Sequence, residues 1–398
     1  MLIKKHILIV APYITFPNEP GANRFIAVAK KLSQKYSVTL VTSKFCHILK
    51  SIRAQNPYMQ DFKVILIDEP GYQKNVSFKR LLSHHIFCKK FEQFLASYNE
   101  PIDLVYSAYP LIKTNYILGK YKKKYEYKLV IDVQDIWPEA ISGPIPLFSN
   151  TIAQKILSPI TRYANTTYSL ADGLVAVSKT YLKRSDVKNL DDNLKKVVYI
   201  GADSLHFENY EREKKAQKII ATYIGTMAGS YDLETVVKAA ALCHEFVQIQ
   251  FIGTGPHEQN LKTLNTEHGN YIRFLGSLTY DNAMKILISS DIAINPIKAT
   301  SQATITNKLS DYFCCGLPII SCQESEEVKE LLALGGGVQY CANNAADLAK
   351  QLIRLSQDRE TLEKMSLVNQ NIAKERFLRD ISYNEISHLV DKLILSDK

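Results

Sequence analysis

The chain has 398 residues, of which 46% are apolar and 22% are charged, a composition typical of a globular protein rather than a disordered one. This length exceeds what one core usually supports, so we predict two domains. The net charge of +9 is uneven, because residues 1–200 contain 29 Lys and Arg against 15 Asp and Glu (+14) and residues 201–398 contain 20 against 25 (−5), which indicates that the first half faces an anionic partner.

The first 200 residues alternate between strand and helix patterns. Apolar runs predict strands at residues 7–12, 37–42, 64–67, 104–106, 129–133, 173–178 and 196–200. Helical spacing predicts helices at residues 25–32, 78–98 and 150–170. Continuous apolar strands separated by helices are typical of a parallel sheet that is covered on both faces.

Residues 201–218 are polar and charged, which indicates a linker, and the alternation then restarts. Strands are predicted at residues 220–225, 247–253, 272–276, 292–296 and 319–322, with helices at 233–244, 255–264, 281–289 and 325–334 and a helical tail over 346–394. We therefore predict an α/β protein with Rossmann-like domains at 1–200 and 219–372 and a C-terminal helix, 373–398, that can cross back to the first domain. Two doubly wound sheets facing across a cleft would bind ligands beyond the carboxyl ends of their strands.

Targeting and membrane-spanning segments are not predicted. Lys155, Arg162 and Asp172 interrupt the longest apolar candidate, and the N-terminus passes from Lys4-Lys5 directly into a strand. Seven cysteines without close pairing predict reduced thiols. We therefore expect a cytoplasmic protein.

Residues 307–318, NKLSDYFCCGLP, form the most specific motif. A short helix that opens with Asn307-Lys308 can hold a diphosphate at its N-terminus, and Asp311 can accept hydrogen bonds from ribose hydroxyls. The segment resembles the signature of glycosyltransferase family 4, usually read as Asn-Lys-Leu-Phe-Glu-Tyr-x-Ala-x-Gly-Lys-Pro. Asp311 stands where that family has its ribose-binding Glu.

The resemblance continues through the second half in the order strand-Gly253-Thr254-Gly255-Pro256, Arg273–Gly276, Asp291–Pro296 and then the motif. An NAD site is disfavoured, since Glu258 replaces the third Gly of the dinucleotide fingerprint. In that family, the backbone of a Phe-Leu-Gly turn binds the base of the donor nucleotide. This turn corresponds to Leu275 and Gly276 here. The donor-binding residues that the resemblance implies are Gly21, Gly225, Thr226, Gly253, Gly255, Leu275, Gly276, Thr304, Thr306, Asn307, Lys308 and Asp311.

Two departures from the family pattern concern the phosphate and sugar ends of the donor. The first acid of the family's paired motif is replaced by Ala303, and the turn at 225–230 lacks the usual Arg and Lys. Both departures also occur in a branch that acts on amino sugars in capsule and O-antigen assembly. The phosphate charge must then be offset by Lys308, the Thr304 and Thr306 hydroxyls and helix amides.

In the first half, Gly21 and Arg24 follow the first predicted strand, as in the family's N-terminal phosphate-facing loop. The string Asp135-Ile136-Trp137-Pro138-Glu139 resembles the branch that is similar to N-acetylfucosamine transferases. Asp135 at a strand end can orient a hydroxyl or polarise a leaving group, with Trp137 and Glu139 near the sugar or acceptor. The structural alternatives are that Gly21 only forms a turn and Arg24 lies at the surface. Likewise, Trp137 could pack in the core and Asp135 could cap a turn.

Basic residues interleaved with aromatic ones suit an anionic membrane surface. They are Lys79, Arg80, Lys89, Lys90, Lys120, Lys122, Lys123 and Lys124. No nucleic-acid motif accompanies them, so nucleic acid is not an expected partner. The alternative is an ordinary solvated helix face.

Taken together, the resemblance implies a GT-B fold and a retaining, metal-independent glycosyltransferase that requires no cofactor. It would move a sugar, expected to be an N-acetylated amino sugar on UDP, to a polyprenyl-diphosphate-linked saccharide at the inner membrane face. Lys308, Arg24 and Asp135 are the expected catalytic residues. The alternatives are a sugar-nucleotide 2-epimerase and a non-catalytic binding subunit on the same fold.

Overall fold

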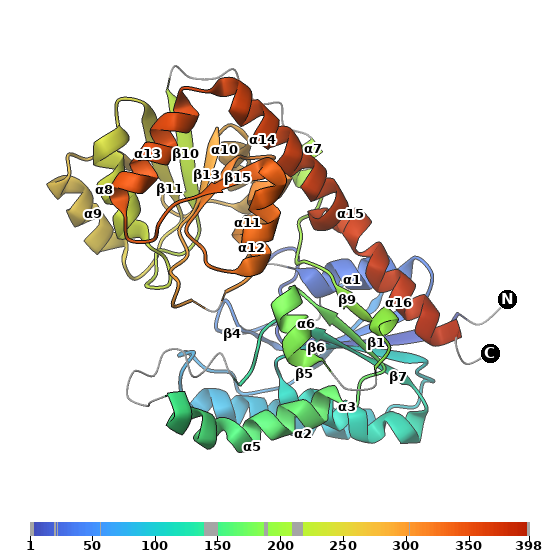
Figure 1. The fold of residues 1–398 in the computed structure, drawn as a ribbon. Helices are drawn as coiled ribbons and strands as arrows, with labels where there is room; N and C mark the ends of the chain where they lie inside the picture. Colours follow the sequence, from blue (N-terminus) through green and yellow to red (C-terminus); the bar gives the residue numbers. More distant parts are fainter. Residues whose placement is uncertain are drawn as a thin grey trace. The chain divides into compact units, whose positions relative to one another are not determined.

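The computed structural model describes residues 4–19, 21, 23–55, 57–138, 150–186, 190–208, 218–301 and 303–395. The chain forms two compact units, one made of Met1–Val198 with Tyr383–Lys398 (unit 1) and the other of Tyr199–Ser382 (unit 2). Each unit is an α/β assembly around a parallel sheet (Figure 1). The predicted alternation of strands and helices is therefore confirmed.

The sheet of unit 1 has seven parallel strands in the order β5-β2-β1-β6-β7-β8-β9. The strands are β1 (His6–Val10), β2 (Ser37–Ser43), β5 (Lys63–Ile67), β6 (Leu104–Tyr109), β7 (Lys128–Val133), β8 (Gly173–Ala176) and β9 (Lys195–Val197). The helices are α1 (Arg24–Ser33), α2 (Phe78–Ala96), α3 (Ile112–Tyr125), α5 (Asn150–Tyr168), α6 (Lys179–Ser185) and α16 (Asn384–Leu395). The patterns did not predict α3, α6 or the small hairpin of β3 (Phe45–Cys46) and β4 (Ser51–Ile52).

Both faces of this sheet are buried, which explains why its strands read as continuous apolar runs. Along β1, Ile7 and Ile9 pack into one core with α1, and Leu8 and Val10 into the other with α2. The first core also contains Leu389 of α16, and α16 contacts α1, β8 and β9 (Figure 1). The C-terminal helix is therefore an integral part of unit 1.

Unit 2 has six parallel strands in the order β12-β11-β10-β13-β14-β15. They are β10 (Ile219–Ile224), β11 (Val247–Ile252), β12 (Ile272–Phe274), β13 (Ile292–Asn295), β14 (Ile319–Ser321) and β15 (Gly337–Gln339). The helices are α7 (Leu205–Glu208), α8 (Leu233–Cys243), α9 (Glu258–Glu267), α10 (Tyr280–Ile288), α11 (Asn307–Cys314), α12 (Glu326–Leu331), α13 (Ala345–Ser356), α14 (Arg359–Ile372) and α15 (Arg379–Ser382). The segment expected as one helical tail is thus four separate helices, with α15 in unit 2 and α16 in unit 1.

Candidate functional site

The strand order of unit 2 identifies where a ligand is expected. From β10 the chain proceeds outward to β11 and β12, and then returns to the other side of β10 with β13. In doubly wound sheets the crevice at this reversal, beyond the carboxyl ends of the two strands, is the usual ligand site. Here it is bordered by the loop that follows β10 and by the segment between β13 and α11.

Three loops at this edge are joined through their backbones. The Gly225 amide donates to Ile252 at 2.9 Å, and the Gly253 amide donates to Gly276 at 2.7 Å. A Cβ atom at Gly253 would lie 2.2 Å from the Gly225 carbonyl oxygen, and one at Gly255 would lie 2.4 Å from that of Met227. These two glycines are therefore required by loop-to-loop packing, whatever their relation to a donor.

Lys308, in the first turn of α11, is a buried cation without a carboxylate partner. Its side chain is 8% exposed. The ammonium Nζ donates to the Tyr223 hydroxyl at 3.1 Å and lies 3.5 Å from the ring centre of Tyr231. Among the described residues it makes no ion pair, and burial lowers the pKa of Lys308 well below its ordinary value. Because buried charges are normally paired, this environment is suited to an anionic ligand.

The two tyrosine rings hold the ammonium through cation–π contacts, with Nζ 4.4 Å from the ring centre of Tyr223. Gly225 makes room for it, since a Cβ atom there would lie 2.7 Å from Lys308 Nζ. The positive φ of Gly225, 137°, also favours glycine at this position. Gly225 thus has a specific steric role next to the cation. The following residue, Thr226, gives its carbonyl to the Tyr223 hydroxyl at 2.8 Å.

The segment before α11 carries an unsatisfied hydroxyl. Thr304 is buried, and its Oγ1 has no hydrogen-bond partner among the described residues. Its backbone is fixed by Gln323, whose side-chain amide donates to the carbonyls of Ala303 and Thr304, each at 2.7 Å. Asn295 in turn donates to Gln323 at 2.9 Å. Ala303, which stands where the family has its first acid, is therefore held in place through its backbone carbonyl.

Helix α11 begins where the predicted helix begins. Thr306 caps it, because the Thr306 hydroxyl oxygen accepts from the Leu309 amide at 3.3 Å. Asn307 is the first helical residue, so its amide and that of Lys308 belong to the N-terminal turn that can bind an anion. The Thr306 oxygen is thus occupied by the cap.

Asp311 lies one turn further along α11 and is 8% exposed. Its carboxylate accepts from the hydroxyl of Tyr280 at 2.7 Å. At the neighbouring loop, the Leu275 amide donates to Phe251 of the sheet at 2.9 Å, and the Gly276 carbonyl accepts from Gly253. A base at this turn would therefore use the Leu275 carbonyl and the Gly276 amide. A Cβ atom at Gly276 would meet nothing within 4 Å.

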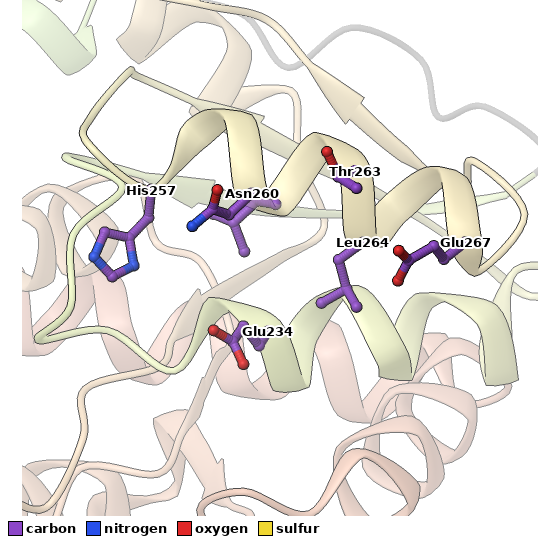
Figure 2. A pocket seen from close by; sticks show the side chains of 7 residues that line it. Glu234, His257, Asn260, Thr263, Leu264 and Glu267 are labelled. Carbon is purple, nitrogen blue, oxygen red and sulfur yellow. The ribbon is translucent and has the colours of Figure 1, made fainter.

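A pocket of about 320 Å³ lies between α8 and α9 of unit 2 (Figure 2). Its lining contains the carboxylates of Glu234 and Glu267 and no Lys or Arg. Lys308, Thr304 and Asp311 are not part of it. Two acidic groups without a cation oppose the binding of a diphosphate, so we do not assign the donor to this pocket.

In unit 1, Arg24 does not present a free cation. Its guanidinium is 3% exposed and makes two hydrogen bonds to the buried Asp132 carboxylate, at 2.9 and 3.3 Å. Burial opposes the charge of Arg24, but Asp132 outweighs it and the pKa of Arg24 is raised. Tyr106 donates to the same carboxylate at 2.6 Å. This placement argues against the expected phosphate role of Arg24, because the pair is part of the core.

Gly21 has a φ of 118°, and a Cβ atom there would lie 2.6 Å from the Ile48 side chain. The positive φ and the lack of space beside Ile48 each account for a glycine at position 21, so no bound ligand is needed to explain it.

Asp135 and Trp137 follow β7 at the carboxyl edge of the unit 1 sheet. Asp135 is half-buried, and burial raises the pKa of its carboxyl group. The Trp137 carbonyl accepts from the Tyr109 hydroxyl at 2.6 Å, and its ring lies 5.9 Å from the guanidinium of Arg80. Glu139, the third member of the predicted string, lies outside the described residues.

The predicted basic surface divides into two groups. Lys120 pairs with Glu92, Lys122 pairs with Asp172, and Lys124 donates to the Ala96 carbonyl. Arg80 lies over Trp137, as described above. Within the predicted group, Lys79, Lys89, Lys90 and Lys123 are exposed and form neither an ion pair nor a hydrogen bond with a described residue. The predicted surface is therefore smaller than the sequence indicated.

Two further features bear on the predictions. Within the described part of the chain, no group of three or more His, Cys, Asp or Glu side chains is arranged to hold a metal ion. None of the helices described is long and apolar enough to cross a membrane.

Residues 218–358, which contain every unit 2 residue discussed above, match the family model "Glycosyl transferases group 1". The search of curated proteins gave no match. Among solved structures, Alr3699/HepE of Anabaena in complex with UDP has a TM-score of 0.68 at 17% identity, covering 98% of this chain and 100% of that one. The sucrose-phosphate synthase of Thermosynechococcus elongatus has a TM-score of 0.72 at 13% identity, covering 99% and 100%.

A third structure, WaaG, described as a glycosyltransferase involved in lipopolysaccharide biosynthesis, has a TM-score of 0.65 at 10% identity and covers 96% and 99%. These matches span nearly the whole of both chains. The protein has the GT-B fold. The predicted fold is thereby confirmed.

Several residues of this GT-B site were missed from the sequence. Tyr223 and Tyr231 contact Lys308, Tyr280 contacts Asp311, and Gln323 fixes the segment before α11. Tyr223 lies in the strand predicted at 220–225, and Tyr231 lies between the turn at 225–230 and the helix predicted at 233–244. One sequence feature could have pointed to these residues, because Tyr223 and Tyr231 flank the loop that lacks the family's Arg and Lys.

Proposed function

We propose that the protein is a glycosyltransferase whose UDP-linked donor binds at the carboxyl edge of the unit 2 sheet. The observation that carries this proposal is Lys308, a buried ammonium with no carboxylate partner in the described structure. The unpaired Thr304 hydroxyl and the N-terminal turn of α11 accompany it. A cation, a hydroxyl and helix amides together are suited to a diphosphate.

The comparisons support this proposal. The match to group 1 glycosyl transferases includes Lys308, Thr304 and Asp311. Solved structures of Alr3699/HepE contain UDP, UDP and glucose, or UDP-glucose. In the proposed site, Asp311 and Tyr280 receive the ribose, and the Leu275 carbonyl and Gly276 amide receive the base.

The finer chemistry of the proposal follows the family resemblance. We propose a retaining transfer in which Lys308 and the α11 amides stabilise the departing diphosphate. Because these groups supply the positive charge, transfer is expected to continue in the presence of EDTA. Asp135, with its raised pKa, is assigned to the sugar or acceptor hydroxyl.

We further propose an N-acetylated amino sugar as the transferred group and a polyprenyl-diphosphate-linked saccharide as the acceptor, at the inner membrane face. The basic excess of the first half supports an anionic partner. The exposed Lys79, Lys89, Lys90 and Lys123 would each contribute about 1 kcal/mol near anionic lipid.

A thermal-shift comparison of UDP, GDP, ADP and TDP with EDTA present is the direct test of the donor. A ligand that binds only the folded state raises the melting temperature, so UDP should give the largest shift. Lys308→Ala should abolish that shift, whereas Lys238→Ala, which alters an exposed lysine of α8, should keep it. Equal shifts with all four nucleotides, or none, would count against the proposal.

Transfer is then measured with a panel of UDP-sugars and a lipid-linked acceptor. The anomeric configuration of the product, read by NMR, tests retention. Binding of UDP without transfer or donor hydrolysis would favour the non-catalytic binding subunit instead.

A further inference from the structure

A second cluster of polar side chains lies in unit 1, outside the donor site. It brings together Tyr13 after β1, His47 and Lys50 near the β3–β4 hairpin, and Arg80 and His84 of α2. The ring centres of Tyr13 and His47 are 5.7 Å apart, and those of Tyr13 and His84 are 5.2 Å apart. These residues come from three separate segments, and only Arg80 among them has a role predicted from the sequence.

The two cations of this cluster have only neutral partners. Lys50 donates to the Asn75 side chain at 2.6 Å and to His47 at 3.3 Å. Arg80 donates to the Asn75 carbonyl at 2.7 Å and to His84 at 3.4 Å. Among the described residues, neither cation forms an ion pair with a carboxylate. Two unneutralised cations sharing Asn75 repel each other, and an anion placed with them would relieve that repulsion.

The hydrogen bonds also define the state of both imidazoles. His47 Nδ1 accepts from Lys50 and lies 2.6 Å from the Tyr72 hydroxyl, and His84 Nε2 accepts from Arg80. A ring nitrogen that accepts from a cation carries no proton, so each ring has its N–H donor on the other nitrogen. Burial and the neighbouring cations lower the pKa of both histidines to about 4, which agrees with neutral rings.

Tyr13 adds an unsatisfied group. Its hydroxyl is buried and has no hydrogen-bond partner among the described residues. The carboxyl group of Glu69 is buried, and its two oxygens accept from the hydroxyls of Ser43 and Ser83. Burial raises the pKa of Glu69, and each of its two oxygens already has a serine hydroxyl as donor. The cluster is therefore rich in donors and poor in acceptors.

Exposed apolar side chains adjoin these donors in the chain. Ile48 and Leu49 stand between His47 and Lys50 and are 49% and 51% exposed. Beyond Asn75 and around Arg80, the exposed fractions are 94% for Val76, 80% for Phe78 and 65% for Leu81. Apolar surface of this kind next to an anion site is complementary to a ligand with an anionic head and an apolar chain.

We propose that this cluster is the binding site for the phosphate head of a lipid-linked acceptor. Lys50, Arg80 and the Tyr13 hydroxyl contact the phosphate oxygens, and the exposed side chains around Phe78 contact the first units of the lipid. The proposal rests on the function proposed above, and it names the acceptor end of that reaction.

The test uses the full chain and farnesyl diphosphate as the probe, with farnesol and inorganic pyrophosphate as its two halves. Trp137, the only tryptophan, lies 5.9 Å from the Arg80 guanidinium, so its fluorescence reports on the cluster. Calorimetry provides affinities independently of that signal. We expect farnesyl diphosphate to bind at least about tenfold more tightly than either half, since both parts of the site contribute.

Variants then identify the site. Arg80→Ala and Lys50→Ala should each weaken the binding of farnesyl diphosphate about ten- to a hundredfold, as expected for losing a charge-assisted hydrogen bond. Lys30→Ala is the matched control, because it removes an exposed cation of unit 1, on α1, that lies outside both the cluster and the basic surface. Phe78→Ala should weaken the binding of farnesyl diphosphate and leave the affinity for pyrophosphate unchanged. Unchanged hydrogen-exchange protection in β1 and β8 shows that unit 1 of each variant is folded.

Four results would overturn the proposal: unchanged binding by Arg80→Ala, an equal loss with Lys30→Ala, equal affinity for farnesol and its diphosphate, or pyrophosphate binding as tightly as farnesyl diphosphate. Arg80-dependent binding of phosphatidylglycerol vesicles without farnesyl diphosphate binding would overturn it too, in favour of bulk lipid. If UDP binding persists while the probe fails, only this inference falls. Loss of UDP binding in the unaltered protein would instead refute the donor site.

Discussion

At the scale of single residues, Lys308 has an arrangement that favours ligand binding over stability. A buried ammonium held by two tyrosine rings is poorly compensated in the empty protein. An arriving diphosphate would supply the missing charge. Arg24 is the opposite case, because its buried charge already has Asp132 as a partner. The comparison separates a cation that awaits a ligand from one that belongs to the core.

Lys308→Met tests this contrast. Removing the uncompensated charge should raise the free energy of unfolding by roughly 1–2 kcal/mol while the UDP-induced thermal shift disappears. Chemical denaturation with and without UDP measures both quantities. Lys238→Met is the exposed control and should change neither.

The increase in the free energy of unfolding expected for Lys308→Met depends on pH in a defined direction. Burial lowers the pKa of Lys308 below its ordinary 10.5, so between the folded and unfolded pKa values the unfolded chain binds more protons. The stability contributed by this group therefore rises with pH in that window. The advantage of Lys308→Met should be largest below the folded pKa and shrink as the pH approaches 10.5. A constant advantage would contradict this account.

Gly225→Ala tests the space beside the ammonium. The added Cβ atom would lie 2.7 Å from Lys308 Nζ, so the cation must shift and UDP affinity should fall. The positive φ adds a strain of about 1–3 kcal/mol. Gly335→Ala is the matched control, since its φ is 105° and its Cβ atom would meet only Val368 at 3.9 Å. Both variants should lose stability, and only Gly225→Ala should lose UDP binding beyond that.

At the scale of elements, the first turns of α11 and α2 each belong to a proposed binding site. Helix α11 keeps its first turn at the donor edge through the Thr306 cap and the Gln323 contacts. Helix α2 buries Phe87, Phe91 and Leu95 along its C-terminal part. Its first turns instead expose apolar residues that a core helix would bury.

Thr306→Val removes the cap of α11 and should cost about 1 kcal/mol of stability. It should also weaken UDP binding, because the amides of the first turn lose their fixed direction. Asn344→Ala removes the equivalent cap of α13, where the Asn344 side chain accepts from the Asp347 amide, and should cost stability alone. Thr306→Ser should restore both properties. Equal UDP affinity in Thr306→Val and Asn344→Ala would refute the role of the α11 terminus.

At the scale of the whole molecule, the chain leaves unit 1 after Val198, forms unit 2 and returns with its last helix. Leu389, Val390 and Leu393 of α16 are buried in the unit 1 core. Unit 1 therefore cannot complete its core until the end of the chain has been made. The residues proposed to bind UDP all belong to unit 2, so completion of the unit 1 core and UDP binding can be tested separately.

Deleting residues 383–398 should unfold unit 1, because each of these three apolar side chains contributes about 2–5 kcal/mol. Hydrogen exchange should show loss of protection in β1 and β8, with protection in β10 and β11 retained. UDP should still bind. Leu395→Ala, at a position that is 56% exposed, should change stability by less than about 0.5 kcal/mol. Loss of protection in unit 2 would show that the units do not fold independently.

The sequence alone determined the α/β alternation, the two sheets and the segment that contains Lys308 and Asp311. These depend on local patterns, since strand and helix periods and helix caps are encoded within a few residues. Pairings between distant residues required the tertiary structure. Arg24 meets Asp132, 108 positions later, and Lys50 of the β3–β4 hairpin meets Asn75, 25 positions later. Such partners follow from strand order and side-chain packing, which periodicity does not record, and they decided which cations are free to bind a ligand.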